Sequence, residues 1–458
     1  MVFGSGARRR GRSLVFVSSC ATVDRLQYLE LDGTILVSNS LACLLAAAGG
    51  RLDPTYPDYM VTLRSVVRGL EHYERILPSN RGPVQLSYCE NLRWDGDDLW
   101  PEAKPWASRD FRTFASYIAF LDEALGRLDE NLSAADRSYV YRMLGTVSSG
   151  YDSPMVTVLA RRHGLDTALS FPEGRKPLLG SAEPPPEGGD RIGARLGVRV
   201  LDVPRDAWQQ DADAAIPFLA GDGNGQEVLF KGAERHLAGT VLLTGMSGDT
   251  IWGRHAKGGD GMLARGDQSG LSLTEYRLHA GFIHLPLPFI GANQASDLRA
   301  LSNSPDLAAW SVGGSYDRPI CRRVVEEAGI ERESFGRSKV AASVRFSLRE
   351  NFWSAGFRGE FLDWLAARRA LWLRRGHLPP AWKSALARPV QRLLASAAHW
   401  LHRSRPTWAG GYLVRRRLEY LGGRELLYKY LFPWAVERTS QRYESLPEPG
   451  VHEARSSG

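Results

Sequence analysis

The sequence predicts an α/β protein built on a parallel sheet, with a small β-rich region before it and helices after it. Three observations support this prediction. Strand-like and helix-like segments alternate in the middle of the chain, a turn-rich region with a strong hairpin pattern precedes them, and amphipathic helical patterns follow. The length of 458 residues, 43% of them apolar, is enough for two or three packed domains.

Residues 1–105 make up the predicted β-rich region. "LQYLELDGTILVSNS" has two alternating apolar arms around Asp32 and Gly33, which is a strong hairpin pattern. "CLLAAAGG" predicts a short helix that glycine ends, "GPVQLSYCENLRW" predicts a further strand, and "GDDLWPEAKPW" predicts an exit loop.

Residues 106–350 make up the predicted parallel-sheet domain. "RDFRTFASYIAFLDEALGRLDENL" has apolar residues at helical spacing. After it, the predicted strands "RMLGTVSS", "LDTALSF", "VRVLDVP" and "TVLLTG" are separated by the predicted helices "SPMVTVLARRHG", "GDRIGARLG" and "EVLFKGAERHLAG". This alternation indicates a parallel sheet that helices cover on both faces, with "GDGNGQEV" as a surface loop.

After about residue 260 the chain is predicted to be mostly helical. "HAGFIHLPLPFIG", with His279 and His284, is either a buried packing segment or the lining of an acyl-substrate pocket. Residues 351–440 form an extension of helices rich in arginine and tryptophan. These helices either pack on the domain with solvated arginines or face an anionic partner or membrane surface. Residues 441–458 are expected to be a disordered tail.

Charge and cysteine usage exclude several classes of protein. The net charge of +7 is mildly basic for this length, so no nucleic-acid partner is expected. The four cysteines form no CxxC pair, which argues against a zinc site and a disulfide framework and favours the cytoplasm. Apolar stretches are too short for a membrane-spanning helix, and no transmembrane segment is expected.

The stretch "VSSGYDSPMV" lies between a predicted strand and a predicted helix. The N–H groups of a helix N-terminus attract anions, Gly150 permits close approach of the backbone, and Ser148 and Ser153 offer hydroxyl donors. Asp152 would repel a bare phosphate but suits one that is bound together with Mg²⁺. The alternative is that Asp152 or Ser153 only caps the helix.

A second stretch, "TVLLTGMSGDTIWG", repeats this chemistry further along the chain. It offers Thr244, Gly245 and a second acid, Asp249, after another predicted strand. If the two strands are neighbours, Asp152 and Asp249 emerge at the edge of the sheet where open α/β folds bind ligands. Two carboxylates together with phosphate oxygens would make a suitable Mg²⁺ site.

The two stretches together resemble a known family. "SSGYDS" resembles the pyrophosphate-binding loop of N-type ATP pyrophosphatases, and "LTGMSGDTIWG" resembles a motif of the asparagine synthetases. The pair is similar to the synthetase domain of the asparagine synthetase-like family, whose relatives include β-lactam synthetases and lasso peptide cyclases. The resemblance implies that residues 106–350 form a PP-loop, adenine nucleotide α-hydrolase-like domain. Residues 1–105 resemble the last part of the family's N-terminal glutaminase domain, in truncated form.

The resemblance also implies a reaction, its cofactors and its site residues. A carboxylate attacks the α-phosphate of ATP in the presence of Mg²⁺, pyrophosphate leaves, and an amine displaces AMP from the acyl-adenylate. Asp152 and Asp249 would hold Mg²⁺. "DRPICRRVVEEAGIERESFGRSKVAAS" resembles the segment with the family's catalytic lysine, here Lys339. The residues implied to bind ATP and pyrophosphate are Val147, Ser148, Ser149, Gly150, Asp152, Ser153, Thr244 and Gly245.

Two departures from the family concern the amine. Val2 follows Met1 where glutamine-using members have a cysteine, so no glutaminase activity is expected and ammonia would come from a separate donor. Met246 stands where the family has glutamate or tyrosine, and methionine cannot accept a proton.

The sequence therefore predicts an amide-forming ligase that acts on a small-molecule, glycan or peptide carboxylate, with a precursor peptide as one candidate partner. The alternatives are a nucleotide-binding partner or sensor without catalysis and a PP-loop enzyme that modifies tRNA.

Overall fold

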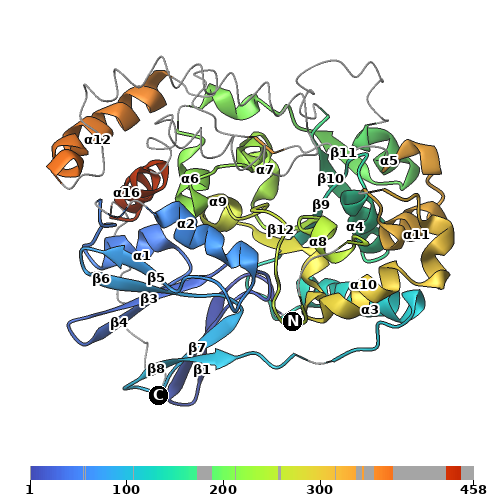
Figure 1. Cartoon of the computed structure of the whole chain (residues 1–458), viewed down its shortest axis with the longest axis horizontal. Coiled ribbons are helices and arrows are strands. Elements are labelled where there is room, and N and C mark those ends of the chain that lie inside the picture. The colour runs from blue at the N-terminus through green and yellow to red at the C-terminus, as the bar shows by residue number, and fades with distance from the viewer. Residues whose placement is uncertain are drawn as a thin grey trace.

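Three sheets organise the chain (Figure 1). The computed structural model describes residues 2–54, 56, 58–106, 108–172, 188–211, 213–255, 259–314, 316–336, 343–344, 355–374 and 430–444. Two of the sheets are antiparallel and come from the N-terminal region, and the third is parallel and forms the centre of the larger domain. The predicted α/β class, with a small β-rich region before the parallel sheet, is confirmed.

The N-terminal region forms two four-stranded antiparallel sheets. One has the strand order β1 (Gly6–Arg10), β2 (Ser13–Val17), β7 (Glu90–Trp94) and β8 (Leu99–Ala103). The other has the order β4 (Thr34–Ser38), β3 (Leu26–Leu31), β6 (Gly82–Ser87) and β5 (Ile76–Ser79). Helices α1 (Leu41–Ala47) and α2 (Tyr59–Arg64) pack against the second sheet.

The predicted hairpin around Asp32 and Gly33 is confirmed as β3–β4. Both residues have positive φ, at 50° and 75°, which is the backbone that a tight type I′ turn requires. Two other predictions in this region are wrong. "GPVQLSYCENLRW" is not one strand, because the chain turns at Cys89 (φ 59°) and passes from β6 into β7 of the other sheet. The predicted exit loop contains β8, which pairs with β7.

The larger domain contains a five-stranded parallel sheet in the order β11–β10–β9–β12–β13. Its strands are β9 (Arg142–Thr146), β10 (Thr167–Ser170), β11 (Arg199–Asp202), β12 (Thr240–Thr244) and β13 (Ile283–Pro286). The predicted alternation supplies the first four strands. The fifth, β13, lies in "HAGFIHLPLPFIG", within the part of the chain predicted to be mostly helical. Most of this stretch is buried, which agrees with its interpretation as a packing segment.

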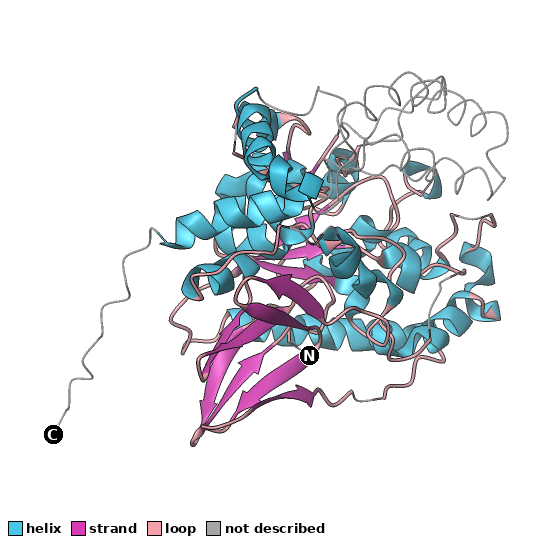
Figure 2. Ribbon diagram, turned by 60° about the vertical axis from the view of Figure 1, so that its left-hand side comes forward, coloured by secondary structure: helices cyan, strands magenta, loops and turns pink. Residues whose placement is uncertain are grey.

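Helices cover both faces of this sheet (Figure 2). Met143, Val241 and Leu243 pack into one apolar cluster with α3 (Phe114–Leu132), α4 (Asp152–Arg161) and α11 (Pro319–Glu327). The side chains between them in sequence, Leu144 and Leu242, point to the other face, where they join α6 (Ile216–Asp222) and α9 (Leu273–Ala280). This is the two-sided burial expected of a parallel sheet.

Shorter elements complete this domain. They are α5 (Gly189–Arg195), α7 (Glu234–Leu237), α8 (Gly248–Ile251) and α10 (Ala295–Ser302). The predicted helix "EVLFKGAERHLAG" is a 3₁₀ segment, Val228–Ala233, that continues into α7. Within the described part of the chain, no helix has the length and apolar character needed to cross a bilayer.

The last described helix, α16 (Leu431–Glu444), is part of the core. Phe432 and Trp434 are buried, and Ser440 Oγ donates to the carbonyl of Ala42 in α1 at 3.0 Å. The helix runs past residue 440, where the tail was expected to begin. The predicted helix near residue 360 is observed as α12 (Ala355–Arg374), whereas the second amphipathic segment, "PVQRLLASAAHWLHRSR", lies outside the described residues.

A buried polar seam joins the N-terminal region to the parallel-sheet domain. Arg277 pairs with Asp24 at 2.5 Å, Thr274 Oγ1 donates to the Val23 carbonyl at 2.7 Å, and Arg25 donates to the Gly221 carbonyl at 3.1 Å. "GDGNGQEV" belongs to this seam and is mostly buried, so the prediction of a surface loop is wrong. Hydrogen bonds with distant residues, such as those that Glu227 makes with Gly270 and Ser272, replace water for part of its polar groups.

Glu227 is a buried acid of this seam whose pKa is strongly raised. Its Oε1 accepts from the Gly270 amide at 2.8 Å, and its Oε2 accepts from the Ser272 hydroxyl. Burial, followed by the charge of Asp222, raises the pKa of Glu227 to about 7. The unfolded chain therefore releases this proton at lower pH than the folded chain does. The Glu227 contribution to stability is complete below about pH 4.5 and is lost as pH rises towards 7.

We expect Glu227→Gln to flatten the pH dependence of stability. Relative to the wild type, the variant should gain up to about 3 kcal/mol in the free energy of unfolding between pH 5 and pH 8, because glutamine carries no buried charge. Urea unfolding at the two pH values measures this difference. Glu123→Gln, on the exposed face of α3, is the matched control. An unchanged difference between Glu227→Gln and wild type at the two pH values would contradict the assignment.

Candidate functional site

The candidate site lies at the carboxyl ends of β9 and β12, which are adjacent parallel strands. Leu144 is in register with Leu242, and Thr146 Oγ1 lies 3.4 Å from the Leu243 carbonyl that accepts its hydrogen bond. The chain adds β10 and β11 on one side of β9, and β12 and β13 on the other. The strand order therefore reverses between β9 and β12, which is where open α/β sheets form their ligand crevice.

The loop 147–153 leads from β9 into α4. Val147 is buried, and its N–H donates to the Leu169 carbonyl of β10 at 2.9 Å. The hydroxyls of Ser148 and Ser153 meet across the loop at 2.7 Å, and the Gly150 N–H donates to Ser148 Oγ at 3.2 Å. The loop thus brings two hydroxyls and a glycine backbone together at the start of a ten-residue helix.

The helix-cap interpretation of this loop does not agree with the structure. Helix α4 begins at Asp152, so Asp152 and Ser153 are its first helical residues and neither is the N-cap. The N-cap is Tyr151, whose side chain makes no capping hydrogen bond. Tyr151 is instead buried, and its hydroxyl accepts a hydrogen bond from Arg322 of α11. The two hydroxyls and the acid are therefore not explained by capping.

The loop after β12 packs directly on Asp152. A Cβ built on Gly245 would lie 2.5 Å from Asp152 Cβ, and one built on Gly248 would lie 2.5 Å from Asp152 Oδ1. Ser247 turns the chain with φ 69°, and Asp249 follows in the first turn of α8, partly exposed. Glycine is required at both contacts, because any side chain would displace the carboxylate.

Thr244 differs from the other predicted residues. Its side chain is buried, and Oγ1 lies 2.9 Å from Nε2 of His284 in β13. Burial, together with the charges of Arg265 and Arg277, lowers the pKa of His284 to about 3, so this imidazole is neutral. The Thr244 hydroxyl thus links β12 and β13 and points into the sheet rather than towards the loops.

A third segment, 316–322, completes the site and was not predicted. Arg318 forms an ion pair with Asp152 Oδ2, and Cys321 Sγ lies 3.9 Å from Asp152 Oδ1. The Tyr316 and Tyr151 rings are 4.9 Å apart, and Tyr316 Oη lies 3.4 Å from a Cβ built on Gly150. Arg318 and Cys321 belong to the stretch that resembles the family's lysine segment, whereas Tyr316 directly precedes it.

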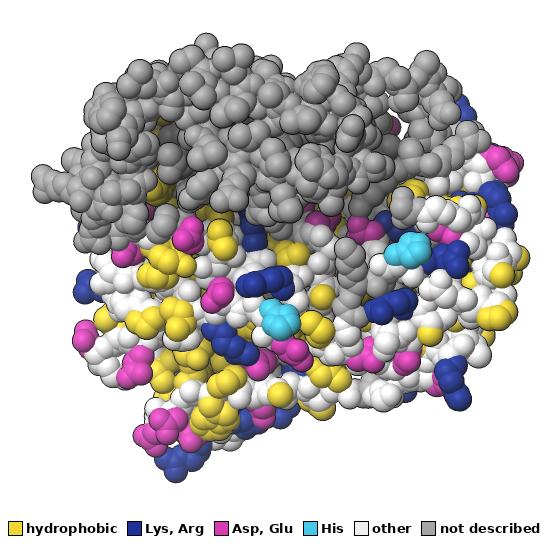
Figure 3. Space-filling model, viewed as in Figure 1, with side chains coloured by type: hydrophobic (Ala, Val, Ile, Leu, Met, Phe, Trp, Pro, Cys, Tyr) yellow, Lys and Arg dark blue, Asp and Glu magenta, His cyan; other side chains and the backbone are white. Residues whose placement is uncertain are grey.

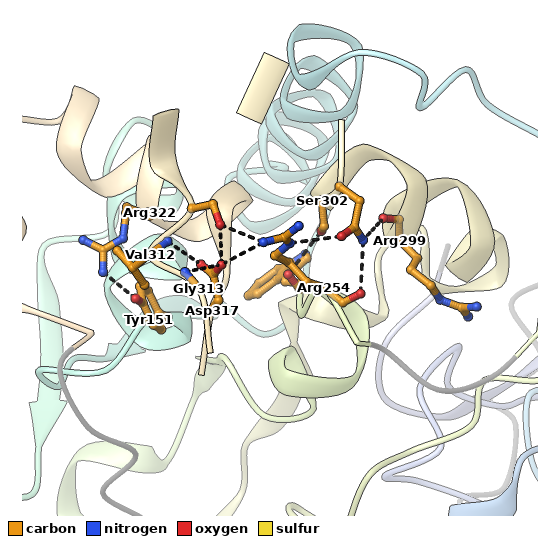
Figure 4. A network of polar contacts seen from close by, with 11 residues as sticks. Tyr151, Arg254, Arg299, Ser302, Val312, Gly313, Asp317 and Arg322 are labelled. Carbon is orange, nitrogen blue, oxygen red and sulfur yellow. Dashed lines mark hydrogen bonds and ion pairs between the residues drawn. The ribbon is translucent and has the colours of Figure 1, made fainter. Parts of the chain in front are cut away.

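Asp317 holds this segment against the chain that follows α8 (Figure 4). Its carboxylate, fully buried, accepts from Ser311 Oγ at 2.6 Å and from the amides of Val312 at 3.2 Å and Gly313 at 3.0 Å. Arg254 Nη1 reaches the same carboxylate at 3.4 Å. Segment 316–322 therefore contacts the first predicted loop through Arg318, and through Asp317 it contacts Arg254, which directly follows the second predicted stretch.

Burial controls the charges around Asp152. Desolvation opposes the charge on Arg318, but the adjacent Asp152 carboxylate raises the pKa of the guanidinium, which stays ionised. Burial, followed by the same carboxylate, raises the pKa of the Cys321 thiol and of the Tyr316 phenol, so both stay protonated. Asp152 therefore lies between a charged guanidinium and a neutral thiol donor, with the neutral Tyr316 phenol nearby.

The predicted Mg²⁺ ligands meet only part of what a metal needs. Asp152 and Asp249 lie at the carboxyl ends of neighbouring strands, as predicted. Among the described residues, no group of three or more histidine, cysteine, aspartate or glutamate side chains could hold a metal. Two carboxylates fit Mg²⁺ when phosphate oxygens and water supply its other ligands.

Lys339 lies outside the described residues, but the chain leading to it is anchored on the site. The Gly336 N–H donates to the Ser149 carbonyl at 2.8 Å, and Gly336 (φ 68°) packs on the Tyr151 ring so closely that a Cβ there would collide with it. Met246 is partly buried, and its Sδ lies 3.2 Å from a Cβ built on Gly270.

Comparison of the sequence with known protein families finds no matching family, and a search among curated proteins finds no match.

Acidic and basic side chains are interspersed over the described part of the face seen in Figure 3.

We expect Asp317→Ala to destabilise the site strongly. The change removes a buried carboxylate that accepts hydrogen bonds from the partly buried Ser311 hydroxyl and the exposed Gly313 amide, at a cost of about 1.5–3 kcal/mol in the free energy of unfolding. Urea unfolding measures this loss. Asp306→Ala removes an acid that is paired with Arg323 near the surface and should cost under about 1 kcal/mol. Equal losses in the two variants would show that Asp317 does not hold the segment.

Proposed function

We propose that the chain is an ATP-dependent, AMP-forming carbon–nitrogen ligase of the asparagine synthetase type. The observation that carries the proposal is the pairing of β9 with β12, which brings two loops rich in serine, glycine and aspartate to the switch point of a parallel sheet. The reaction would activate a carboxylate as its adenylate, release pyrophosphate and transfer the acyl group to an amine or ammonia.

The loop 147–153 would bind the phosphates that leave. Ser148 and Ser153, whose hydroxyls lie within 2.7 Å of each other, can turn their protons towards phosphate oxygens. The Gly150 backbone and the N-terminus of α4 add N–H donors and a partial positive charge. Val147 and Ser149 hold the loop through their backbones, to β10 and to Gly336.

Asp152 and Asp249 would hold Mg²⁺, and the backbone of Thr244 and Gly245 would lie beside AMP. When bound, Mg²⁺ supplies positive charge to the phosphate oxygens as the bond to pyrophosphate breaks. Gly245 and Gly248 would fix the direction of the Asp152 carboxylate, since both pack on it.

Lys339 would stabilise negative charge on the reacting phosphorus or on the tetrahedral carbon. The anchoring of Gly336 supports this role. Gly336, which donates its N–H to the Ser149 carbonyl, precedes Lys339 by three positions in the sequence.

The amine half of the reaction would use no glutaminase of this chain. Cys20 is 4% exposed and lies 3.8 Å from Lys104 Nζ, so it is not accessible to glutamine. Met246 cannot accept a proton, so the amine would arrive neutral, as ammonia from a separate donor does. The acyl substrate would be a small-molecule, glycan or peptide carboxylate, the last of these as a precursor peptide.

A second candidate function is a nucleotide-binding sensor without catalysis. Met246 favours it, because the partly buried thioether provides no base at the position where the related enzymes have glutamate or tyrosine. This protein would bind ATP but release no pyrophosphate with any carboxylate.

We expect the wild type to exchange pyrophosphate into ATP in the presence of one class of carboxylate. Asp152→Asn, Asp249→Asn and Lys339→Ala should each lower this exchange by at least about a hundredfold, because each removes charge that stabilises the transition state. Asp306→Asn is the control and should leave the rate unchanged. ATP binding without exchange across a panel of carboxylates would favour the sensor, and full exchange by Asp152→Asn would contradict the metal assignment.

A further inference from the structure

The Asp152 carboxylate is enclosed by protein on the sides where a metal would bind. Oδ2 pairs with the guanidinium of Arg318, and Oδ1 lies against Gly248 and the Cys321 thiol. The Asp152 side chain is 22% exposed, whereas that of Arg318 is 4% exposed. Most of the contact between the two charges is therefore shielded from water. Ionic attraction is stronger in such a shielded place than in water.

A guanidinium and a divalent cation cannot share this carboxylate in the observed geometry. Each would lie within a few ångströms of the same oxygen, and the repulsion between like charges rises as water is excluded. The Gly248 backbone leaves little room for the carboxylate to turn its other oxygen outwards. A metal at Asp152 therefore requires Arg318 to move.

Arg318 has two features that suit it to such a movement. Its guanidinium lies 5.1 Å from the centre of the Tyr316 ring, a contact that does not depend on Asp152. Guanidinium groups also bind phosphate oxygens in the bidentate manner in which they bind carboxylates. The phosphate-binding hydroxyl of Ser153 belongs to the residue next to Asp152. A polyphosphate in the loop could therefore compete with Asp152 for Arg318.

We propose that Arg318 and the divalent cation compete for Asp152, so that the metal binds there only when a nucleotide polyphosphate draws Arg318 away. This inference rests on the proposed role of Asp152 as a metal ligand of an ATP-dependent ligase. Asp152 then does not bind free metal, but it binds metal that arrives together with a polyphosphate.

The test measures Mn²⁺ binding to the full chain by electron paramagnetic resonance, first without nucleotide. Arg318→Met should bind Mn²⁺ at least about tenfold more tightly than the wild type, because the competing charge is gone. Arg323→Met is the control. It removes an arginine of α11 whose ion pairs are with Asp306 and Glu327, and it should match the wild type. Equal affinities for the wild type and Arg318→Met would overturn the proposal.

Asp152→Asn tests the same point with the Arg318 side chain still present, in case Arg318→Met does not fold. Without nucleotide, this variant should bind Mn²⁺ no more weakly than the wild type, because Arg318 already blocks the carboxylate. A weaker affinity of Asp152→Asn would show that Asp152 was open to metal and would overturn the proposal.

The second arm adds ATP. The wild type should then gain a protein-bound Mn²⁺ signal that Asp152→Asn lacks, whereas a signal identical in the two proteins would overturn the proposal. Failure of the wild type to bind ATP would contradict the proposed function instead, and the comparison without nucleotide would still decide the competition between Arg318 and metal.

Discussion

The pairing of β9 with β12 is the interaction on which the rest of the site depends. These strands are separated in sequence by β10 and β11, and only the parallel register between them brings Asp152 against Gly245 and Gly248. Because both strands are buried on two faces, a slip of register would expose apolar side chains. The packing of the sheet therefore fixes the geometry of the loops.

The N-terminal region contributes to this rigidity. Its contacts with the larger domain include the buried pair Asp24–Arg277, and Glu275 of α9 accepts hydrogen bonds from Ser40 and from Tyr443 of α16, both at 2.9 Å. Because these groups are out of contact with water, each needs its partner in place, and the polar contacts fix the orientation of the two parts. These contacts hold the N-terminal region in one orientation against the parallel-sheet domain.

Local patterns in the sequence predicted the elements whose causes are local. The alternation of strands and helices, the Asp32–Gly33 turn and the two acidic loops could all be found this way. Partners distant in sequence could not. In the sequence, Arg318 is one of many arginines, and only the fold brings it against Asp152. The loop around Asp222 and Glu227 has the composition of a surface loop, and it can be buried because remote residues supply some of its hydrogen bonds. The short strand β13 lacks alternation because it is buried on both faces.

Helix α16 has a consequence for the synthesis of the chain. Its aromatic residues fill the core that α1 and α6 share, and Ser440 bonds to Ala42, close to the beginning of the sequence. The apolar side chains of α1 and α6 therefore leave the ribosome long before α16, the helix that covers them, has been made. Until then the apolar residues that α16 contacts on α1 and α6 are uncovered, and exposed apolar surface of this kind promotes aggregation and chaperone binding.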